Sequence, residues 1–316
     1  MANNKSIRFA LQLVISLGIL GAFLYYLYNN SERYLELLNI SKVGVLILFL
    51  LSLTFPLLTS AQNTFLYRGV GLTEFSYRDG ILITAASTLA NQLPVPGGIL
   101  SRGYYLKQIH KLSYAKYTSS TIALLFCFLA INGLIGITVL FYWTIINKIT
   151  VPFTLLIAFT LMVGSILVFW VPMEKIRLPE KLRQRMDQAI DGWTAISRNP
   201  GLLFRLILLQ AVLVTLLSLR YWIAFRMLSQ NVSLGQALLF ASASILTQLV
   251  SIAPGGLGVR EGIVASVASV LGFDAGISII AVGLDRLVIT VTIVLTGWAS
   301  TVILGRQITY ISDEPA

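Results

Sequence analysis

The sequence predicts an all-α polytopic membrane protein with about six transmembrane helices and two re-entrant helical hairpins, arranged as an inverted repeat. Three observations lead to this prediction. Hydrophobic residues make up 56% of the 316 residues and charged residues only 11%, against about a quarter in ordinary soluble domains. The apolar residues form long uncharged runs, and a Pro-Gly-Gly sequence followed by an arginine occurs twice.

The long apolar segments are the first element of the prediction. A helix that crosses the hydrocarbon core needs roughly 20 apolar residues, and backbone in lipid must satisfy its own hydrogen bonds. Segments of this kind lie at about residues 7–28, 43–66, 117–146, 151–172, 201–227 and 275–304. The first is too long for the apolar part of a signal peptide, and no small-residue cleavage site follows it. We therefore expect it to be a retained helix.

Positively charged residues gather before the first span, between residues 68 and 116, and between residues 175 and 198. Because cytoplasmic loops are the ones rich in Lys and Arg, we expect these segments and both termini on the cytoplasmic side of an inner membrane. The charge flanks the spans, so anionic membrane lipid is the expected partner and nucleic acid is not. Segment 175–199 has apolar residues at helical spacing, typical of an amphipathic helix on the inner surface or of an ordinary loop helix.

Two shorter apolar segments are interrupted by Pro and Gly. Residues 81–93 would extend only about 20 Å as a helix, which is short of the membrane core. Residues 94–98, which follow, contain two prolines and two glycines that a continuous helix tolerates poorly. Basic residues resume after them, so a re-entrant hairpin from the inside fits better than a span. Residues 236–252 and 257–271 flank the second break and predict a second hairpin, entering from the outside.

An internal repeat relates the two breaks. A shift of 158 residues superimposes them and aligns segment 43–66 with the start of segment 201–227. The chain is therefore expected to be a single transmembrane domain with a first repeat at about 1–150 and a second at about 151–316. Each repeat would hold three spans and one hairpin, and an odd number of spans puts the repeats in opposite orientation. Such inverted repeats are typical of transporters with substrate sites at interrupted helices.

The helix that begins after each break is the candidate functional element. Its first backbone N–H groups are unpaired and lie at the positive end of the helix dipole, where anions and phosphate bind. We expect a site for an anionic lipid headgroup formed by Pro96, Gly97, Gly98, Arg102, Pro254, Gly255, Gly256 and Arg260. The alternative is that the glycines permit tight helix packing and the arginines reach out to water.

Ionisable residues inside the apolar segments are further candidates, because charge within a membrane is expensive and faces a cavity or a partner. Arg220, Asp285 and Arg286 are of this kind. Asp285 and Arg286 are adjacent, so they point about 100° apart and cannot easily pair with each other. Glu261 is a candidate partner for Arg286 or Arg220. The alternative role for these charges is a purely structural ion pair.

Four polar residues just before the breaks, Asn91, Gln92, Thr247 and Gln248, would line the same cavity, or would instead hydrogen-bond between helices. His110 is the only histidine, and Cys127 is the only cysteine. The sequence contains no catalytic motif and no paired carboxylates at a catalytic spacing. We therefore expect no enzymatic activity, no metal and no cofactor.

Residues 251–262, Ser-Ile-Ala-Pro-Gly-Gly-Leu-Gly-Val-Arg-Glu-Gly, resemble the signature of the flippase-like transmembrane module of bacterial lysylphosphatidylglycerol synthases. The first break with Arg102 fits the same pattern, and Arg286 matches a basic residue of the family. The resemblance implies movement of a lipid or lipid-linked molecule between leaflets. It also implies a stand-alone member lacking the aminoacyltransferase domain of the fused synthases. The sequence departs from the pattern at Leu125 and Phe126, where an acidic–basic pair is expected.

These features together predict a flippase-like transporter that moves an anionic phospholipid or lipid-linked molecule between leaflets. One alternative is a non-transporting scaffold in lipid or envelope biosynthesis, working with a separately encoded lipid-modifying enzyme. Another is an ion-coupled transporter of a small soluble anion, with Glu261 and Asp285 as its coupling residues. The sequence makes no prediction of the oligomeric state.

Overall fold

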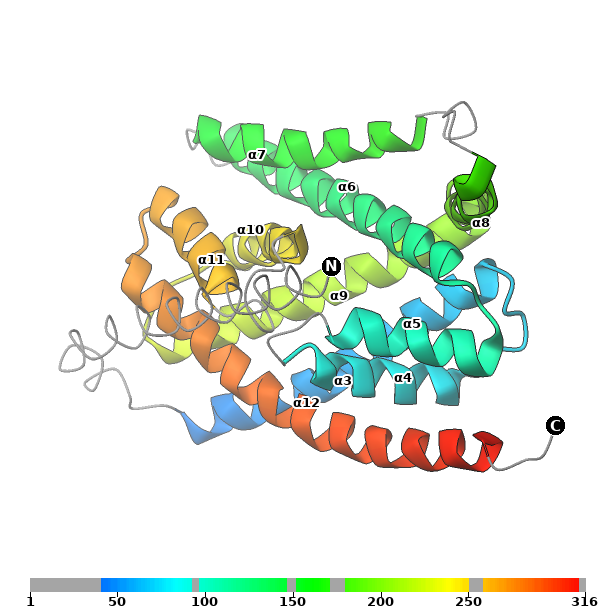
Figure 1. The fold of residues 1–316 in the computed structure, drawn as a ribbon. Helices are drawn as coiled ribbons and strands as arrows, with labels where there is room; N and C mark the ends of the chain where they lie inside the picture. The colour runs from blue at the N-terminus through cyan, green and yellow to red at the C-terminus, as the bar shows by residue number, and fades with distance from the viewer. Residues whose placement is uncertain (1–40, 93–96, 147–151, 171–179, 250–257, 313–316) are drawn as a thin grey trace, which may run out of the picture.

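The computed structural model describes residues 41–92, 97–146, 152–170, 180–249 and 258–312, and this part of the chain is helical almost throughout (Figure 1). Its α-helices are α3 (Lys42–Gly69), α4 (Tyr77–Ala90), α5 (Gly97–His110), α6 (Tyr114–Ile146), α7 (Phe153–Gly164), α8 (Glu180–Ser197), α9 (Pro200–Met227), α10 (Leu234–Ala243), α11 (Val259–Val270) and α12 (Ala275–Ser312). Two 3-10 segments, η1 (Ser165–Trp170) and η3 (Ser244–Leu249), continue α7 and α10.

Four of these helices are long and apolar enough to cross a membrane: α3, α6, α9 and α12. Each lies where the sequence predicts a span. The predicted span at 151–172 is shorter, because α7 ends at Gly164 and η1 continues it to Trp170. The predicted span at 7–28 lies outside the described residues. The chain is thus an all-helical polytopic membrane protein, as the sequence predicts.

Short polar side chains define where several helices begin. Ser41 accepts a hydrogen bond from the backbone N–H of Gly44 at the start of α3. Asn199 does the same for Leu202 at the start of α9. At α10, Ser233 and Gln236 satisfy each other's backbone N–H groups in a capping box. Such caps supply acceptors that the first turn of a helix lacks, so the helix boundaries follow from local sequence.

Each predicted hairpin is a pair of short helices packed against each other, α4 with α5 and α10–η3 with α11 (Figure 1). Helix α4 begins at Tyr77, earlier than residue 81, where the sequence placed the start of this segment. Helices α4 and α5 have 14 residues each, which is about 21 Å and less than the membrane core. The lengths therefore agree with helices that enter the membrane without crossing it.

The packing contacts between helices in one half have counterparts in the other half. Helices α3 and α9, which the repeat aligns, pack against each other. Helix α12 packs against α4, and its counterpart α6 packs against α10, the counterpart of α4. This is the pattern that a pseudo-twofold axis between α3 and α9 would produce. The repeat boundary near residue 150 and the opposite orientation of the repeats stay predictions.

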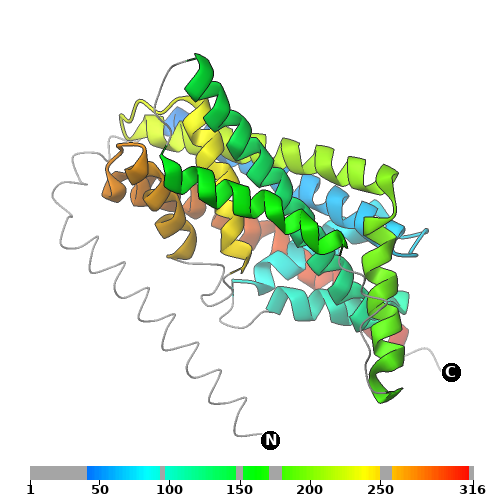
Figure 2. The same ribbon diagram turned by 90° about the horizontal axis from the view of Figure 1, so that it is seen from above.

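Helix α8 forms within the segment predicted to be amphipathic. Figures 1 and 2 show α6 and α7 as neighbours, and α8 also packs against α6. Trp193 and Ile196 are buried, and the Trp193 ring meets the Phe126 ring of α6 edge-on at 6.3 Å between centroids. These apolar side chains of α8 contact protein, so this part of the helix fits an ordinary loop helix better than one lying on lipid.

Candidate functional site

The first break differs in detail from the expectation. Gly97 and Gly98 are the first residues of α5, so the prediction that the helix begins only after residues 94–98 is wrong, and Pro96 lies outside the described residues. The helix can begin there because the Asn91 side chain accepts a hydrogen bond from the Gly98 backbone N–H, at 2.9 Å. A Cβ on Gly98 would collide with the Asn91 side chain and the Ser87 carbonyl. Tight packing therefore accounts for this glycine.

Arg102 of α5 donates hydrogen bonds only to neutral groups among the described residues. Its Nε and Nη2 donate to the Ser87 hydroxyl at 3.1 and 2.6 Å, and its Nη1 donates to Asn63 Oδ1 at 3.3 Å. The Asn63 amide in turn donates to Thr84 at 2.9 Å. The guanidinium thus ties α5 to α4 and α3, and all three of its nitrogens are engaged.

At the second break, Pro254, Gly255 and Gly256 lie outside the described residues. Helix α11 begins at Val259 after Gly258, whose φ of +78° lies in the left-handed region that glycine adopts without strain. Gly258 supplies no side-chain cap to the first turn. The second residue of the helix, Arg260, is half-buried, and its Nε is buried with no hydrogen-bond acceptor in the described part of the chain.

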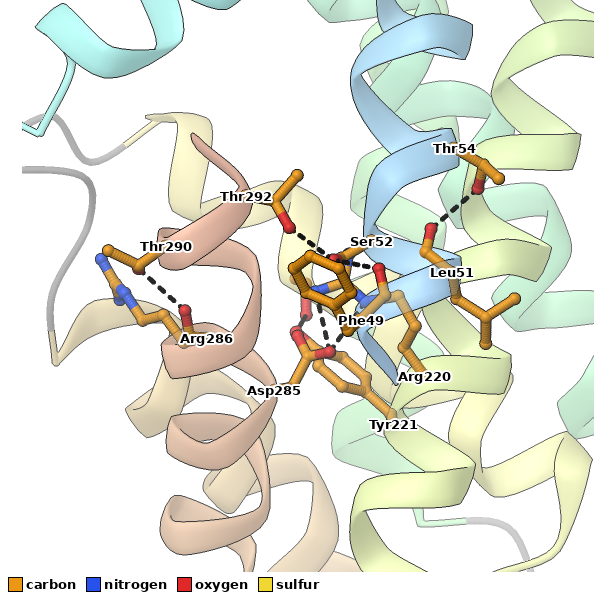
Figure 3. A network of polar contacts seen from close by, with 11 residues as sticks. Phe49, Leu51, Ser52, Thr54, Arg220, Tyr221, Asp285, Arg286, Thr290 and Thr292 are labelled. Carbon is orange, nitrogen blue, oxygen red and sulfur yellow. Dashed lines mark hydrogen bonds and ion pairs between the residues drawn. The ribbon is translucent and has the colours of Figure 1, made fainter. Parts of the chain in front are cut away.

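A buried ion pair joins α9 to α12 in the second half (Figure 3). Arg220 Nε donates to Asp285 Oδ1 at 2.8 Å, and Nη2 lies 2.8 Å from the same oxygen. Arg220 and Asp285 are 0% and 1% exposed, so neither charge is hydrated. A hydrogen bond of 2.7 Å between Ser52 and Thr292 ties α3 to α12 nearby. The polar contacts of three long helices therefore meet around Arg220.

A second ion pair joins α12 to α11. Arg286 Nη1 donates to Glu261 Oε1 at 2.8 Å. Figure 3 shows Asp285 and Arg286 leaving α12 in different directions, which agrees with their adjacent positions on a helix. Of the two partners considered for Glu261, the structure selects Arg286.

Several buried polar atoms of the second half lack a hydrogen-bond partner within the described residues. They are Arg220 Nη1, Ser242 Oγ, Thr247 Oγ1, Arg260 Nε, Glu261 Oε2 and Asp285 Oδ2. Buried polar groups are nearly always hydrogen-bonded, so these atoms are unusual. A ligand or ordered water could engage these atoms. The network therefore retains hydrogen-bonding capacity at the helix that follows the second break.

The remaining predicted residues lie at the edges of the hairpins. Gln92 is half-buried just after α4, and Gln248 is exposed in η3. The sequence-based predictions did not single out Asn63 and Ser87, which bond Arg102, or Tyr221, which lies beside Arg220 in Figure 3. Each is a polar residue inside an otherwise apolar helical run, so the sequence alone could have identified it.

Comparison with known proteins gives one match. The sequence profile of the lysylphosphatidylglycerol synthase TM region matches residues 9–297. No curated protein and no solved structure matches the chain.

Proposed function

The chain belongs to the lysylphosphatidylglycerol synthase TM family, and on that premise we propose that it moves a phospholipid or lipid-linked molecule with an anionic headgroup between membrane leaflets. The headgroup binds at the helix breaks, within the cytoplasmic membrane of the cell. The protein acts as a transporter and carries out no catalysis itself.

The charge balance of the second half is the observation that carries this proposal. Around the two ion pairs of α9, α11 and α12, three arginines face two carboxylates, which leaves one positive charge in excess; they are Arg220, Arg260, Arg286, Glu261 and Asp285. Arg220 and Arg286 each have a carboxylate partner, whereas Arg260 has none among the described residues. Unbalanced charge inside a membrane protein is costly unless a ligand neutralises it. An anion at Arg260 would restore neutrality.

The arrangement of the hairpins supports movement between leaflets. The exchangeable packing of the two halves suits an inverted repeat, in which one hairpin would enter from each side of the membrane. A headgroup held between such hairpins could be released to either leaflet while its acyl chains stay in lipid. The exposed apolar side chains of α12, such as Leu287, Leu295 and Trp298, suit contact with those chains.

Lipid movement in reconstituted vesicles tests the proposal. The full-length protein is placed in phosphatidylcholine vesicles with a trace of fluorescent phosphatidylglycerol, and dithionite then destroys the fluorescence of the outer leaflet. We expect wild-type protein to bring inner-leaflet lipid to the quencher. Arg260→Gln should slow this movement by about tenfold or more, the value of one charge-assisted hydrogen bond.

Arg205→Gln is the matched control, because Arg205 is an exposed residue of α9 and its loss removes one positive charge outside the network. It should retain the wild-type rate. Wild-type vesicles that quench no further than protein-free vesicles would contradict transport. Copurification with a lipid-modifying enzyme would then indicate the scaffold, and anion uptake driven by a proton or sodium gradient would indicate the ion-coupled carrier.

A further inference from the structure

The repeat allows the surroundings of Arg102 and Arg260 to be compared position by position. Three side chains supply acceptors to Arg102 and to the first turn of α5: Asn63, Ser87 and Asn91. The shift of 158 residues puts Tyr221, Ile245 and Leu249 at these positions in the second half. Two of these side chains are apolar, so the second half lacks two of the three acceptors that the first half uses.

The first hairpin consequently offers a ligand fewer free groups than the second. Each nitrogen of the Arg102 guanidinium donates one hydrogen bond within the protein, which uses three of its five N–H groups, and the Gly98 N–H at the start of α5 is capped by Asn91. A ligand at this helix end would have to displace the Asn91 cap and share the guanidinium with Ser87 and Asn63. The contacts join α5 to α4 and α3, so their loss would also loosen the hairpin.

In the second hairpin, the arginine and the start of the following helix have fewer hydrogen-bond partners. Gly258 leaves the first turn of α11 without a side-chain cap, and Arg260 Nε has no acceptor among the described residues. Tyr221, which stands at the position of Asn63, makes no hydrogen bond to Arg260, and its hydroxyl bonds the Ser244 hydroxyl at 3.0 Å. The Ser244 hydroxyl donates to the Phe240 carbonyl, so Tyr221 must be the donor in that bond.

We infer that the two hairpins have different roles: Arg260 and the uncapped start of α11 bind the phosphate of the lipid headgroup, and Arg102 is a positioning residue that holds the first hairpin against α3 and α4. A phosphate suits the second site because its several oxygens can accept from a guanidinium and from backbone N–H groups together. The Thr247 hydroxyl of the neighbouring element η3 is buried and has no hydrogen-bond partner among the described residues, so it is independent evidence of unused donor capacity there. The inference rests on the proposed lipid substrate.

Binding and stability measured on the same variants test the division of roles. Full-length protein in a non-ionic detergent is titrated with a fluorescent short-chain phosphatidylglycerol. A diacylglycerol with the same chains serves as the probe without phosphate. Arg260→Gln should raise the Kd by about tenfold or more and leave the Tm unchanged, because the replaced side chain makes no hydrogen bond within the described protein.

Arg102→Gln should show the reverse result, a lower Tm with a Kd within about threefold of wild type, since it removes three internal hydrogen bonds. If that variant fails to fold, Ser87→Ala replaces it, because it removes the acceptor of two of these bonds and keeps the arginine. Arg205→Gln, on the exposed surface of α9, removes only a cation–π contact with Phe65 at 5.7 Å, so it should leave the Kd unchanged and lower the Tm less than Arg102→Gln does.

The possible contrary outcomes are distinguishable. Equal losses of affinity in the Arg102 and Arg260 variants would overturn the division of roles and leave the proposed function standing. A lower Tm in Arg260→Gln without loss of affinity would make Arg260 structural and would also overturn it. Wild-type binding no tighter for the phospholipid than for diacylglycerol would overturn both proposals. Displacement of the lipid by millimolar inorganic phosphate would assign the site to a free anion and overturn the lipid as its ligand.

Discussion

Helices α6 and α12 occupy equivalent places in the two halves, yet they bury very different side chains. Helix α12 carries Asp285 and Arg286 at the middle of the predicted span, whereas the repeat puts Cys127 and Phe128 at these positions of α6. Cys127 and Phe128 are buried among apolar neighbours, and α6 is covered by α7 and α8. Asp285 and Arg286 form ion pairs with α9 and α11.

The difference shows that, of two equivalent helices in a repeated fold, one can carry buried ion pairs while the other carries none at the same positions. Each charge inside a membrane carries a large desolvation cost and requires a partner. Keeping the charges on α12 allows α6 to be stabilised by apolar packing alone. The equivalent helices therefore share a position in the architecture and differ in what they contribute to it.

The largest loss of stability should come from breaking the ion pair between Asp285 of α12 and Arg220 of α9. Asp285→Ala leaves Arg220, which is 0% exposed, as a buried charge without a partner, and should lower the free energy of unfolding by about 3–5 kcal/mol. Cys127→Ala at the equivalent position of α6 only trims a buried apolar side chain and should lower it by less than about 1.5 kcal/mol. Denaturant unfolding in detergent compares the two, and equal losses would contradict the contrast between the helices.

A double variant sharpens this prediction. Replacing both partners, with Arg220→Gln and Asp285→Asn, removes both charges and leaves groups that can still hydrogen-bond to each other. The double variant should be more stable than either single variant, because each single variant leaves a lone buried charge and the double variant leaves none. Additive losses would show that the two residues do not act as a pair.

A smaller loss of stability is expected from a substitution where α12 packs closely against α4. A Cβ on Gly297 would lie 2.9 Å from the Ala85 carbonyl oxygen, so Gly297→Ala must push the helices apart and should destabilise by about 1–3 kcal/mol. Gly283 lies on the same helix, and a Cβ there meets nothing within 4 Å. Gly283→Ala should therefore be neutral or stabilising by up to about 1 kcal/mol. Thermal unfolding of the two variants measures the difference, and a similar Tm for both would refute close packing at Gly297.

The smallest effect is expected at the neutral polar contact of α12. Thr292→Val removes the hydroxyl bonded to Ser52, and contacts of this kind between membrane helices contribute about 0.6 kcal/mol. The same substitution at Thr138, an exposed residue of α6 whose hydroxyl bonds its own helix, should have no measurable effect. A loss for Thr292→Val as large as that for Asp285→Ala would remove the distinction between neutral and charged contacts.

Much of the fold could be predicted from the sequence, because the membrane forces apolar runs into helices. Helices α3, α6, α9 and α12 begin within three residues of the predicted segments. The contrast of a charge with its apolar surroundings also identified Arg220 and Asp285. Their pairing could not be predicted, because it depends on how α9 and α12 rotate about their own axes when they pack.

The hydrogen-bond partners of Arg102 could not be predicted for the same reason. Asn63 lies 39 positions away from Arg102 along the chain, and Ser87 lies on a different helix of the hairpin. The start of α5 at Gly97 was also misjudged, because the cap that permits it comes from Asn91 across the turn. Polar residues in apolar helices are visible in a sequence, but the partner of each is a property of the packed structure.

Three polar contacts of α12 with its neighbouring helices constrain how the molecule can move. Within about two turns of this helix, Asp285, Arg286 and Thr292 hold α9, α11 and α3 respectively. A sliding or rolling motion of α12 alone would break all three contacts together. In the transport cycle that we propose, these four helices should therefore move as one rigid block past α6, α7 and α8, and spin labels would report constant separations inside the block and changing separations across its boundary.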